Sequence, residues 1–251
     1  MSCPVRARIG PPQGRDAWQL GSPCGFVGVI DYWIMVRADI AARSRRGATR
    51  VPGPAPAGAH IRDGAEFKRL EAEVRRVERD CPSGGDWGKI STRSLDILSS
   101  QSKDILVACW ATYGLFRVEG YVGLAVGFAL LQEMVDAHWE GLFPAIKQEH
   151  ARIGALDWLV ARLAPAVAEA APTEADAAAV VVAYDALYDL VRQLSGKLVD
   201  KQLTLEVLLR TLQPYYEQAT CSLVTATEHA TEAVLAAERA RSTLADPTST
   251  G

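Results

Sequence analysis

The sequence has few cysteines and little net charge. Its five cysteines are odd in number, widely spaced and without a C-x-x-C pair, which argues against a disulfide framework and against a zinc ribbon. The formal net charge of −3 is too close to balance to indicate nucleic-acid binding, so we expect no nucleic-acid partner. Reduced thiols in a cytoplasm fit this composition best, and we expect a cytoplasmic protein.

Long apolar runs are also missing. The longest run near the N-terminus spans residues 24–36, has 13 residues and contains Asp31. It falls short of the ~20 apolar residues that a membrane helix needs. It also lacks the preceding basic segment and the small-residue cleavage site of a signal peptide. We therefore expect a soluble chain.

Sequence motifs of the common enzyme classes are absent. The four histidines show no H-x-x-x-H, H-E-x-x-H or E-x-x-H spacing, and Glu133, Asp136 and Glu140 lack the second E-x-x-H helix of a di-iron site. No phosphate-loop, dinucleotide-binding or G-x-S-x-G motif occurs. We predict no catalytic, metal or cofactor site, no small-molecule substrate and no enzyme activity. The alternative is a helical enzyme whose active-site residues come from separate helices.

What the sequence does contain is helical periodicity from Asp63 onward. Apolar residues recur three and four positions apart, and no alternating strand pattern appears after residue 60. We predict an all-α, bundle-like domain with helices over about 63–81, 87–98, 103–118, 122–139, 153–163, 180–194, 203–214 and 215–244. Helix caps are predicted at Asp63, Asp86, Ser102 and Thr173, with an Ala/Pro hinge over residues 164–172.

Two features predict how these helices pack. Residues 103–118 are apolar nearly all round and include Trp110, so we predict that they form the central buried helix. Gly123 and Gly127 lie four residues apart on the following helix. Without side chains they leave a notch, which we interpret as a place where another helix approaches closely.

Composition divides the chain into three zones. Residues 1–58 are rich in Pro, Gly and Arg, carry a charge of +5 over the first 50 residues and are expected to be a weakly ordered extension. Trp18 and the apolar run of residues 24–36 could instead dock on the body. Met35 is an alternative initiator methionine, if the start codon is assigned too far upstream. Residues 59–216 form the helical domain, and residues 217–251 are an Ala/Thr-rich helix with a disordered tail.

Several short motifs occur in an order that carries a family resemblance. In chain order they are Pro54-Ala55-Pro56-Ala57-Gly58, Ile61-Arg62, Phe67, Asp86-Trp87, Ser102-Lys103-Asp104-Ile105-Leu106-Val107-Ala108, Glu119-Gly120, Gly123-Leu124, Gly127, Trp139, Leu142, Pro144, Arg152 and Trp158-Leu159. Together they resemble the ImpA N-terminal domain of the TssA family of the bacterial type VI secretion system. The resemblance covers about residues 54–163 and extends more loosely to about residue 216.

Most of the motif residues are apolar or helix-capping types, so we assign them to the fold: Trp87, Lys103, Asp104, Gly120, Gly123, Leu124, Trp139, Pro144, Arg152 and Trp158. Lys103 is the exception, because at a helix start it opposes the helix dipole whereas Asp104 complements it. We expect the Lys103 side chain to be solvated, paired with a distant carboxylate or in contact with a partner.

The resemblance implies a cytoplasmic, non-enzymatic assembly protein associated with the secretion apparatus. TssA-like proteins bind baseplate, sheath, tube or membrane-complex proteins and prime or regulate sheath assembly, and a homo-oligomer is compatible with this role. A sheath-capping variant is one alternative. Another is a membrane-surface adaptor that uses the basic segment around Arg43, Arg45, Arg46 and Arg50.

Overall fold

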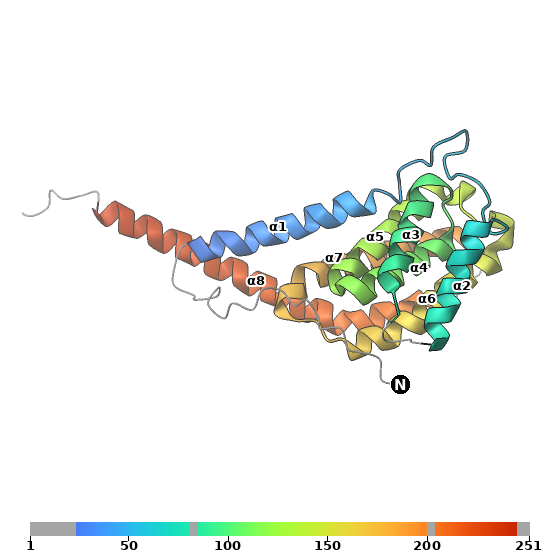
Figure 1. The fold of residues 1–251 in the computed structure, drawn as a ribbon. Coiled ribbons are helices and arrows are strands. Elements are labelled where there is room, and N and C mark those ends of the chain that lie inside the picture. Colours follow the sequence, from blue (N-terminus) through green and yellow to red (C-terminus); the bar gives the residue numbers. More distant parts are fainter. Residues whose placement is uncertain (1–23, 81–84, 200–203, 245–251) are drawn as a thin grey trace, which may run out of the picture.

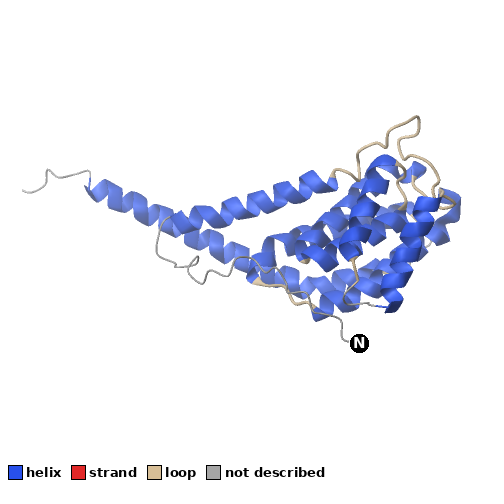
Figure 2. Cartoon of the chain, in the orientation of Figure 1, coloured by secondary structure: helices blue, strands red, loops and turns tan. Residues whose placement is uncertain are grey.

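The computed structural model describes residues 24–80, 85–199 and 204–244, and within these ranges the regular structure is helical, with no strand. This confirms the predicted all-α class (Figures 1 and 2). The α-helices are α1 (Cys24–Ser44), α2 (Ala65–Asp80), α3 (Trp87–Ser100), α4 (Ile105–Glu119), α5 (Tyr121–His138), α6 (Glu149–Glu169), α7 (Ala177–Lys197) and α8 (Leu205–Leu244). Short 3-10 turns η1 (Trp139–Gly141), η2 (Ile146–Gln148) and η3 (Glu174–Asp176) connect some of them. None of the described helices is both long and apolar enough to cross a bilayer.

Helix α4 is the centre of the body, as its apolar sequence predicts. It packs between α3 and α5 and also contacts α6, while α5 packs against α7 on its other side (Figure 1). Trp110 of α4 is only 3% exposed and lies with its ring 5.4 Å from that of Phe67. Burial of an aromatic side chain here joins α4 to α2, so this strongly apolar helix contributes to the core on several sides.

The close contact between α4 and α5 depends on glycines, which confirms the predicted notch. A Cβ atom at Gly123 would lie 2.2 Å from the carbonyl oxygen of Leu115, and one at Gly127 would lie 2.5 Å from Cγ2 of Thr112. Gly120 joins the two helices with a φ of +63°, a conformation that favours glycine. A side chain at Gly123 or Gly127 would force the helices apart.

The N-terminal region differs from the expectation of a weakly ordered extension over residues 1–58. Residues 1–23 lie outside the described residues, but residues 24–44 form helix α1, which packs against α5, α7 and α8. Val36 and Ile40 are buried in the core, and the guanidinium of Arg43 binds both carboxylate oxygens of Glu119 at 2.8 and 2.7 Å. The docking alternative for residues 24–36 is therefore the better description of α1.

Two predicted helix ends are wrong because proline does not end the helix. Helix α6 continues through Pro165 to Glu169, where the sequence predicted a hinge from residue 164. Helix α8 runs for 40 residues through Pro214, so the predicted helices 203–214 and 215–244 are one element and the boundary at residue 216 falls inside it. Its C-terminal part extends away from the body (Figure 1).

The helix caps are mostly local and therefore predictable. Asp86 accepts a hydrogen bond from the backbone N–H of Lys89 at 3.1 Å, and Thr173 and Asp176 form a capping box. The prediction of Ser102 as a cap is wrong by two residues. Asp104 caps α4 instead, accepting from the backbone N–H groups of Leu106 at 2.9 Å and Val107 at 3.4 Å.

Candidate functional site

The motif residues gather at three places in the fold. Beside the N-terminal end of α4, the 45–62 loop and the 139–148 segment meet, and here lie Lys103, Asp104, Trp139, Pro144 and Arg152. Gly120, Gly123 and Leu124 lie at the contact between α4 and α5. Trp87 and Trp158 each contact the ring of Tyr113. The first group contains all of the ionisable motif residues and is the place to look for chemistry.

The backbone of residues 102–105 connects the two loops at this site. The N–H of Lys103 donates to the carbonyl of Ala57 at 2.8 Å, and its carbonyl accepts from the N–H of Phe143 at 2.9 Å. The N–H of Ile105 then donates to the carbonyl of Phe143 at 2.9 Å. The segment before α4 therefore lies between the 45–62 loop and the 139–148 segment and binds both.

Asp104 has two roles at the start of α4: it caps the helix and it binds Arg62. Besides capping the helix, its carboxylate accepts hydrogen bonds from Nε of Arg62 at 2.7 Å and from a terminal nitrogen of Arg62 at 3.0 Å. Asp104 is fully buried whereas Arg62 is partly exposed. A two-bond Arg–carboxylate pair fixes direction as well as distance, so this pair attaches the 45–62 loop to α4.

Lys103 has none of the three environments predicted for it. Its side chain is 0% exposed, and its ammonium group donates to the carbonyl oxygens of Leu98, at 2.9 Å, and of Arg46. Burial lowers the pKa of Lys103 to about 8, because the charged form loses hydration. The lysine precedes the cap of α4 rather than lying in its first turn, which removes the predicted conflict with the helix dipole.

Arg152 binds backbone carbonyls of the 139–148 segment, as Lys103 binds a backbone carbonyl of the 45–62 loop. It is 1% exposed, and its guanidinium donates to the carbonyls of Pro144 at 2.8 Å, Leu142 at 2.8 Å and Trp139 at 3.2 Å. The same group lies 4.4 Å from the centre of the Trp139 ring. Burial lowers the pKa of Arg152, against the opposing charges of Glu140 and Glu149.

Arg62 and His138 also take part in this site, although their sequence context does not indicate it. Arg62 appears in the motif string, but nothing near it in the sequence indicates its partner. Nε2 of His138 lies 2.9 Å from the carbonyl oxygen of Ala48, so the histidine contacts the same loop as Lys103. Burial lowers the pKa of His138, and the charges of Lys103 and Arg50 lower it further, against hydrogen bonds to the Ala48 and Thr49 backbone.

The third group, which contains Trp87 and Trp158, is an aromatic cluster between α3, α4 and α6. The Trp87 and Tyr113 rings meet edge-on at 4.6 Å, and Tyr113 meets Trp158 edge-on at 5.9 Å. Arg162 lies over the Trp158 ring at 4.4 Å and pairs with Glu78 of α2. A small hollow is present beside this cluster, but its charged groups neutralise each other and the aromatic rings pack on one another.

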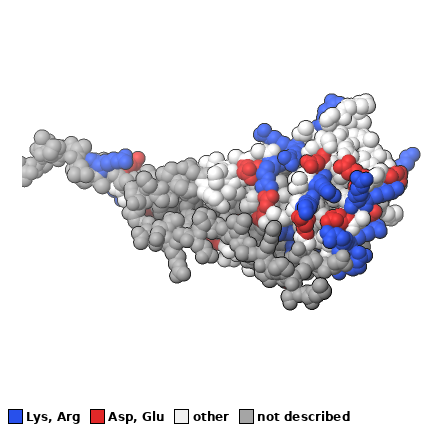
Figure 3. Space-filling model, viewed as in Figure 1, with Lys and Arg blue, Asp and Glu red and all other residues white. Residues whose placement is uncertain are grey.

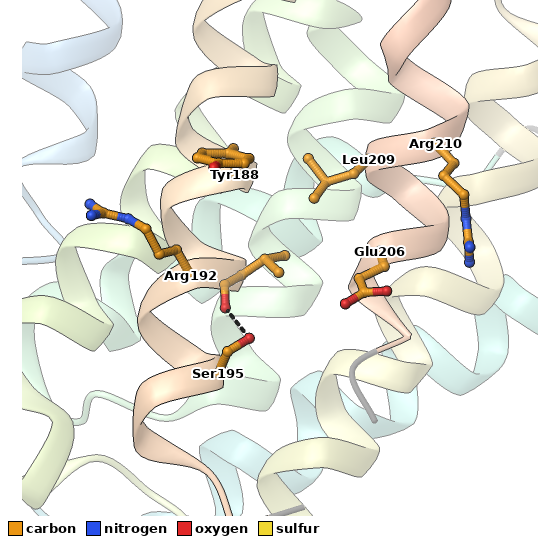
Figure 4. Close-up of a pocket in the computed structure, with 7 residues that line it drawn as sticks. Tyr188, Arg192, Ser195, Glu206, Leu209 and Arg210 are labelled. Atoms are coloured by element: carbon orange, nitrogen blue, oxygen red, sulfur yellow. Dashed lines mark hydrogen bonds between the residues drawn. The ribbon is translucent and has the colours of Figure 1, made fainter. Parts of the chain in front are cut away.

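A second hollow lies between α7 and α8 (Figure 4). Its apolar floor includes Val191 and Leu209, and it is open to solvent. The polar side chains do not converge on a common point: Ser195 donates to the Val191 carbonyl at 2.9 Å, and Arg192 and Arg210 point away on opposite sides. A small-molecule site needs convergent polar groups, and this hollow offers none.

The remaining ionisable candidates stand apart from one another. Among residues 24–80, 85–199 and 204–244, no three His, Cys, Asp or Glu side chains are grouped so as to hold a metal ion. Cys109 is buried in α4, where burial raises the pKa of its thiol, and Cys221 is exposed on α8. The concentrated polar chemistry of the described chain is therefore the buried junction of Arg62, Lys103, Asp104, His138 and Arg152.

Comparison with known proteins finds a family model that matches the part of the chain containing this junction. Residues 48–161 match the family model described as ImpA, N-terminal, type VI secretion system. In a solved structure, the N-terminal domain including the conserved ImpA_N region of the TssA component of the type VI secretion system from Burkholderia cenocepacia has the same fold. The TM-score is 0.56 at 19% identity, over 74% of this chain and 94% of that chain. The comparison with curated proteins gives no significant match.

Proposed function

We propose that this chain, which carries the ImpA N-terminal domain of TssA-like type VI secretion components over residues 48–161, acts as a non-enzymatic assembly protein of that machine. It binds baseplate, sheath, tube or membrane-complex proteins through exposed helical surface, and through these contacts it primes or regulates sheath assembly. The similarity to the TssA domain of Burkholderia cenocepacia supports the fold on which this proposal rests.

The observation that carries the proposal is that the buried charged groups bind the protein's own backbone and one another. Lys103 and Arg152 direct their donors at backbone carbonyls, and Asp104 binds Arg62 and the first turn of α4. A catalytic group needs access to a substrate. These groups instead fix two loops to a helical core, which is the requirement of a rigid binding scaffold.

The surface offers what protein contacts need. Large apolar side chains are exposed on α1 (Ile34 and Met35), on α7 (Tyr188) and on α8 (Val224 and Leu235). Helix α1 and the distal part of α8 extend from the body on the same side (Figure 1). Where α2 lies, the surface carries interspersed basic and acidic side chains (Figure 3). Apolar and mixed-charge helical faces of this kind suit recognition of other proteins.

A complementation experiment tests the proposal. In a strain that carries the type VI genes and lacks this chain, the full chain should restore secretion, and His150→Ala and Asp185→Asn should restore it equally. Both residues are exposed, and single changes outside hot spots weaken a protein interface little. Removal of one catalytic group would lower a rate by several orders of magnitude. Loss of secretion with either variant, at normal protein level and with a measurable turnover by the parent chain, would support the helical enzyme instead.

A further inference from the structure

Three arginines are presented together on the turn that follows α1. Residues 45–50, which we call the arginine turn, contain Arg45, Arg46 and Arg50, all exposed. Within the described part of the chain, none of the three guanidinium groups has a carboxylate within ion-pair distance. Arg43 differs, because Glu119 and Asp39 already neutralise it. The turn is therefore a local excess of positive charge on a chain with a net charge of −3.

The backbone of the arginine turn is held in place from below. Lys103 donates to the carbonyl of Arg46, and His138 contacts the carbonyl of Ala48 at 2.9 Å. Thr49 donates to the carbonyl of Arg45 from its N–H, at 2.9 Å, and from its hydroxyl, at 2.7 Å. Surface loops commonly lack such buried anchors. This arrangement fixes the spacing of the three arginines before any partner arrives.

The fit of the turn to the core adds to this rigidity. Gly47 is buried against α5, where a Cβ atom would lie 2.3 Å from the carbonyl oxygen of Leu130. Beneath the turn lie the ammonium of Lys103, which donates to backbone carbonyls, and the carboxylate of Glu133, which accepts from the Ser44 hydroxyl at 2.7 Å. These two charges are opposite in sign, so the excess positive charge of the turn comes from its three arginines. Ordering costs are low for a preformed surface, so a modest number of contacts suffices for binding.

We infer that the arginine turn is a docking site for a cluster of Asp and Glu side chains on a partner protein. The inference rests on the proposed function only in taking that partner to be a component of the secretion machine. Guanidinium groups match carboxylates in shape and form paired, charge-assisted hydrogen bonds with them. Three guanidinium groups that have no carboxylate partner in the described part of the chain, on a fixed backbone, therefore suit a surface with several closely spaced carboxylates.

Two other anionic partners fit less well. Anionic membranes attract clusters of 4–8 basic residues, often beside an amphipathic apolar face. This turn has three arginines without a carboxylate partner among the described residues, and the exposed large apolar side chains nearest to it in the sequence, Ile34 and Met35, lie about three helical turns earlier on α1. Single-stranded nucleic acid needs aromatic side chains for base stacking. Among the described residues from Met35 to Val118, no Phe, Tyr or Trp side chain is exposed. Carboxylates of a protein surface need neither feature.

The direct test measures binding of a labelled peptide of six glutamates to the full chain by fluorescence polarisation in low salt. A peptide of six glutamines is the neutral probe. The test variant carries Arg45→Glu, Arg46→Glu and Arg50→Glu. The control variant carries Lys68→Glu, Arg69→Glu and Arg93→Glu, which are exposed basic residues on α2 and α3 and give the same change in net charge. Thermal melting of both variants checks that they fold.

We expect the test variant to bind the glutamate peptide at least about tenfold more weakly, whereas the control stays within about threefold of the parent chain. The glutamine peptide should not bind. Equal binding by the test variant, an equal loss in the control or no binding of the glutamate peptide by the parent chain would overturn the inference. Binding to phosphatidylserine vesicles that depends on the three arginines, without binding of the peptide, would favour the membrane instead.

A cellular arm separates this inference from the proposed function. The parent chain and both variants are captured from cells that carry the secretion genes. Recovery of secretion proteins by the parent and control, with at least about a tenfold loss for the arginine-turn variant, supports both proposals. Equal recovery by all three overturns the docking site and leaves the assembly role intact. If the parent recovers none, the assembly role fails and the peptide measurement alone decides the docking site.

Discussion

Arg152→Met should destabilise the domain strongly, because one side chain holds three carbonyls of the 139–148 segment. The substitution keeps an unbranched side chain and removes the donors to Trp139, Leu142 and Pro144. A hydrogen bond to a charged group contributes about 1.5–3 kcal/mol. Release of a buried guanidinium from its desolvation cost offsets part of that loss. We expect the free energy of unfolding to fall by about 3 kcal/mol.

The assay is urea denaturation followed by circular dichroism at neutral pH. With a slope of about 3 kcal/mol per molar urea, the midpoint should fall by about 1 M. Arg192→Met is the matched control, since Arg192 is exposed on α7 and pairs with Asp189 at 3.1 Å, an exposed pair worth about 0–1 kcal/mol. A midpoint for Arg152→Met that equals the control would refute the argument that Arg152 holds the segment.

Three further results are expected. Trp110→Ala should cost about 3–5 kcal/mol in urea denaturation, against about 0–1 kcal/mol for Glu73→Ala on the charged face of α2; equal losses would mean that α4 is not the central helix. A chain that begins at Val51 lacks α1 and should melt well below the full chain in calorimetry, whereas equal melting temperatures would show that α1 adds no stability. For Lys103, the pKa of about 8 in the folded state lies below the ordinary value of 10.5, so the unfolded chain binds more protons between these values and stability rises with pH there. The unfolding free energy of the parent relative to Lys103→Met should therefore increase from pH 8 to 10 in urea titrations, and a constant difference would contradict the buried position of the ammonium.

The sequence predicts the helical body well because its signals are local. The apolar positions of α4 and the glycines of α5 describe one contact from both sides, and the structure has that contact. Asp86 and Thr173 lie within one turn of the N–H groups that they cap, so their roles are readable from spacing. Such features need no knowledge of distant residues.

Helix α1 was missed because its apolar residues do not form one stripe. Residues 24–36 are apolar nearly all round, so periodicity does not distinguish the buried face, with Val36 and Ile40, from the exposed face, with Ile34 and Met35. Its docking also depends on Glu119, far along the chain, which binds Arg43. The tertiary contact, rather than a local signal, determines that this segment is ordered.

The buried junction could be predicted only in part. Lys103, Asp104 and Arg152 were assigned to the fold, but their partners lie at sequence separations that spacing cannot relate. Lys103 binds the carbonyl of Arg46 across 57 positions, and Arg62 binds Asp104 across 42. A basic residue that binds only backbone carbonyls leaves no charge pattern in the sequence. For this reason Lys103 was expected to need a carboxylate or solvent.

Affinity capture from cells that assemble a type VI secretion apparatus tests the central claim most directly. The full chain, tagged at its C-terminus and cross-linked in the cell before gentle lysis, should recover sheath, baseplate, tube or membrane-complex proteins in amounts well above those from a strain without the secretion genes. The Arg152→Met variant, with its scaffold loosened, should recover less at equal protein level. Recovery of none of these components by the full chain would contradict the account of this protein as a secretion assembly component.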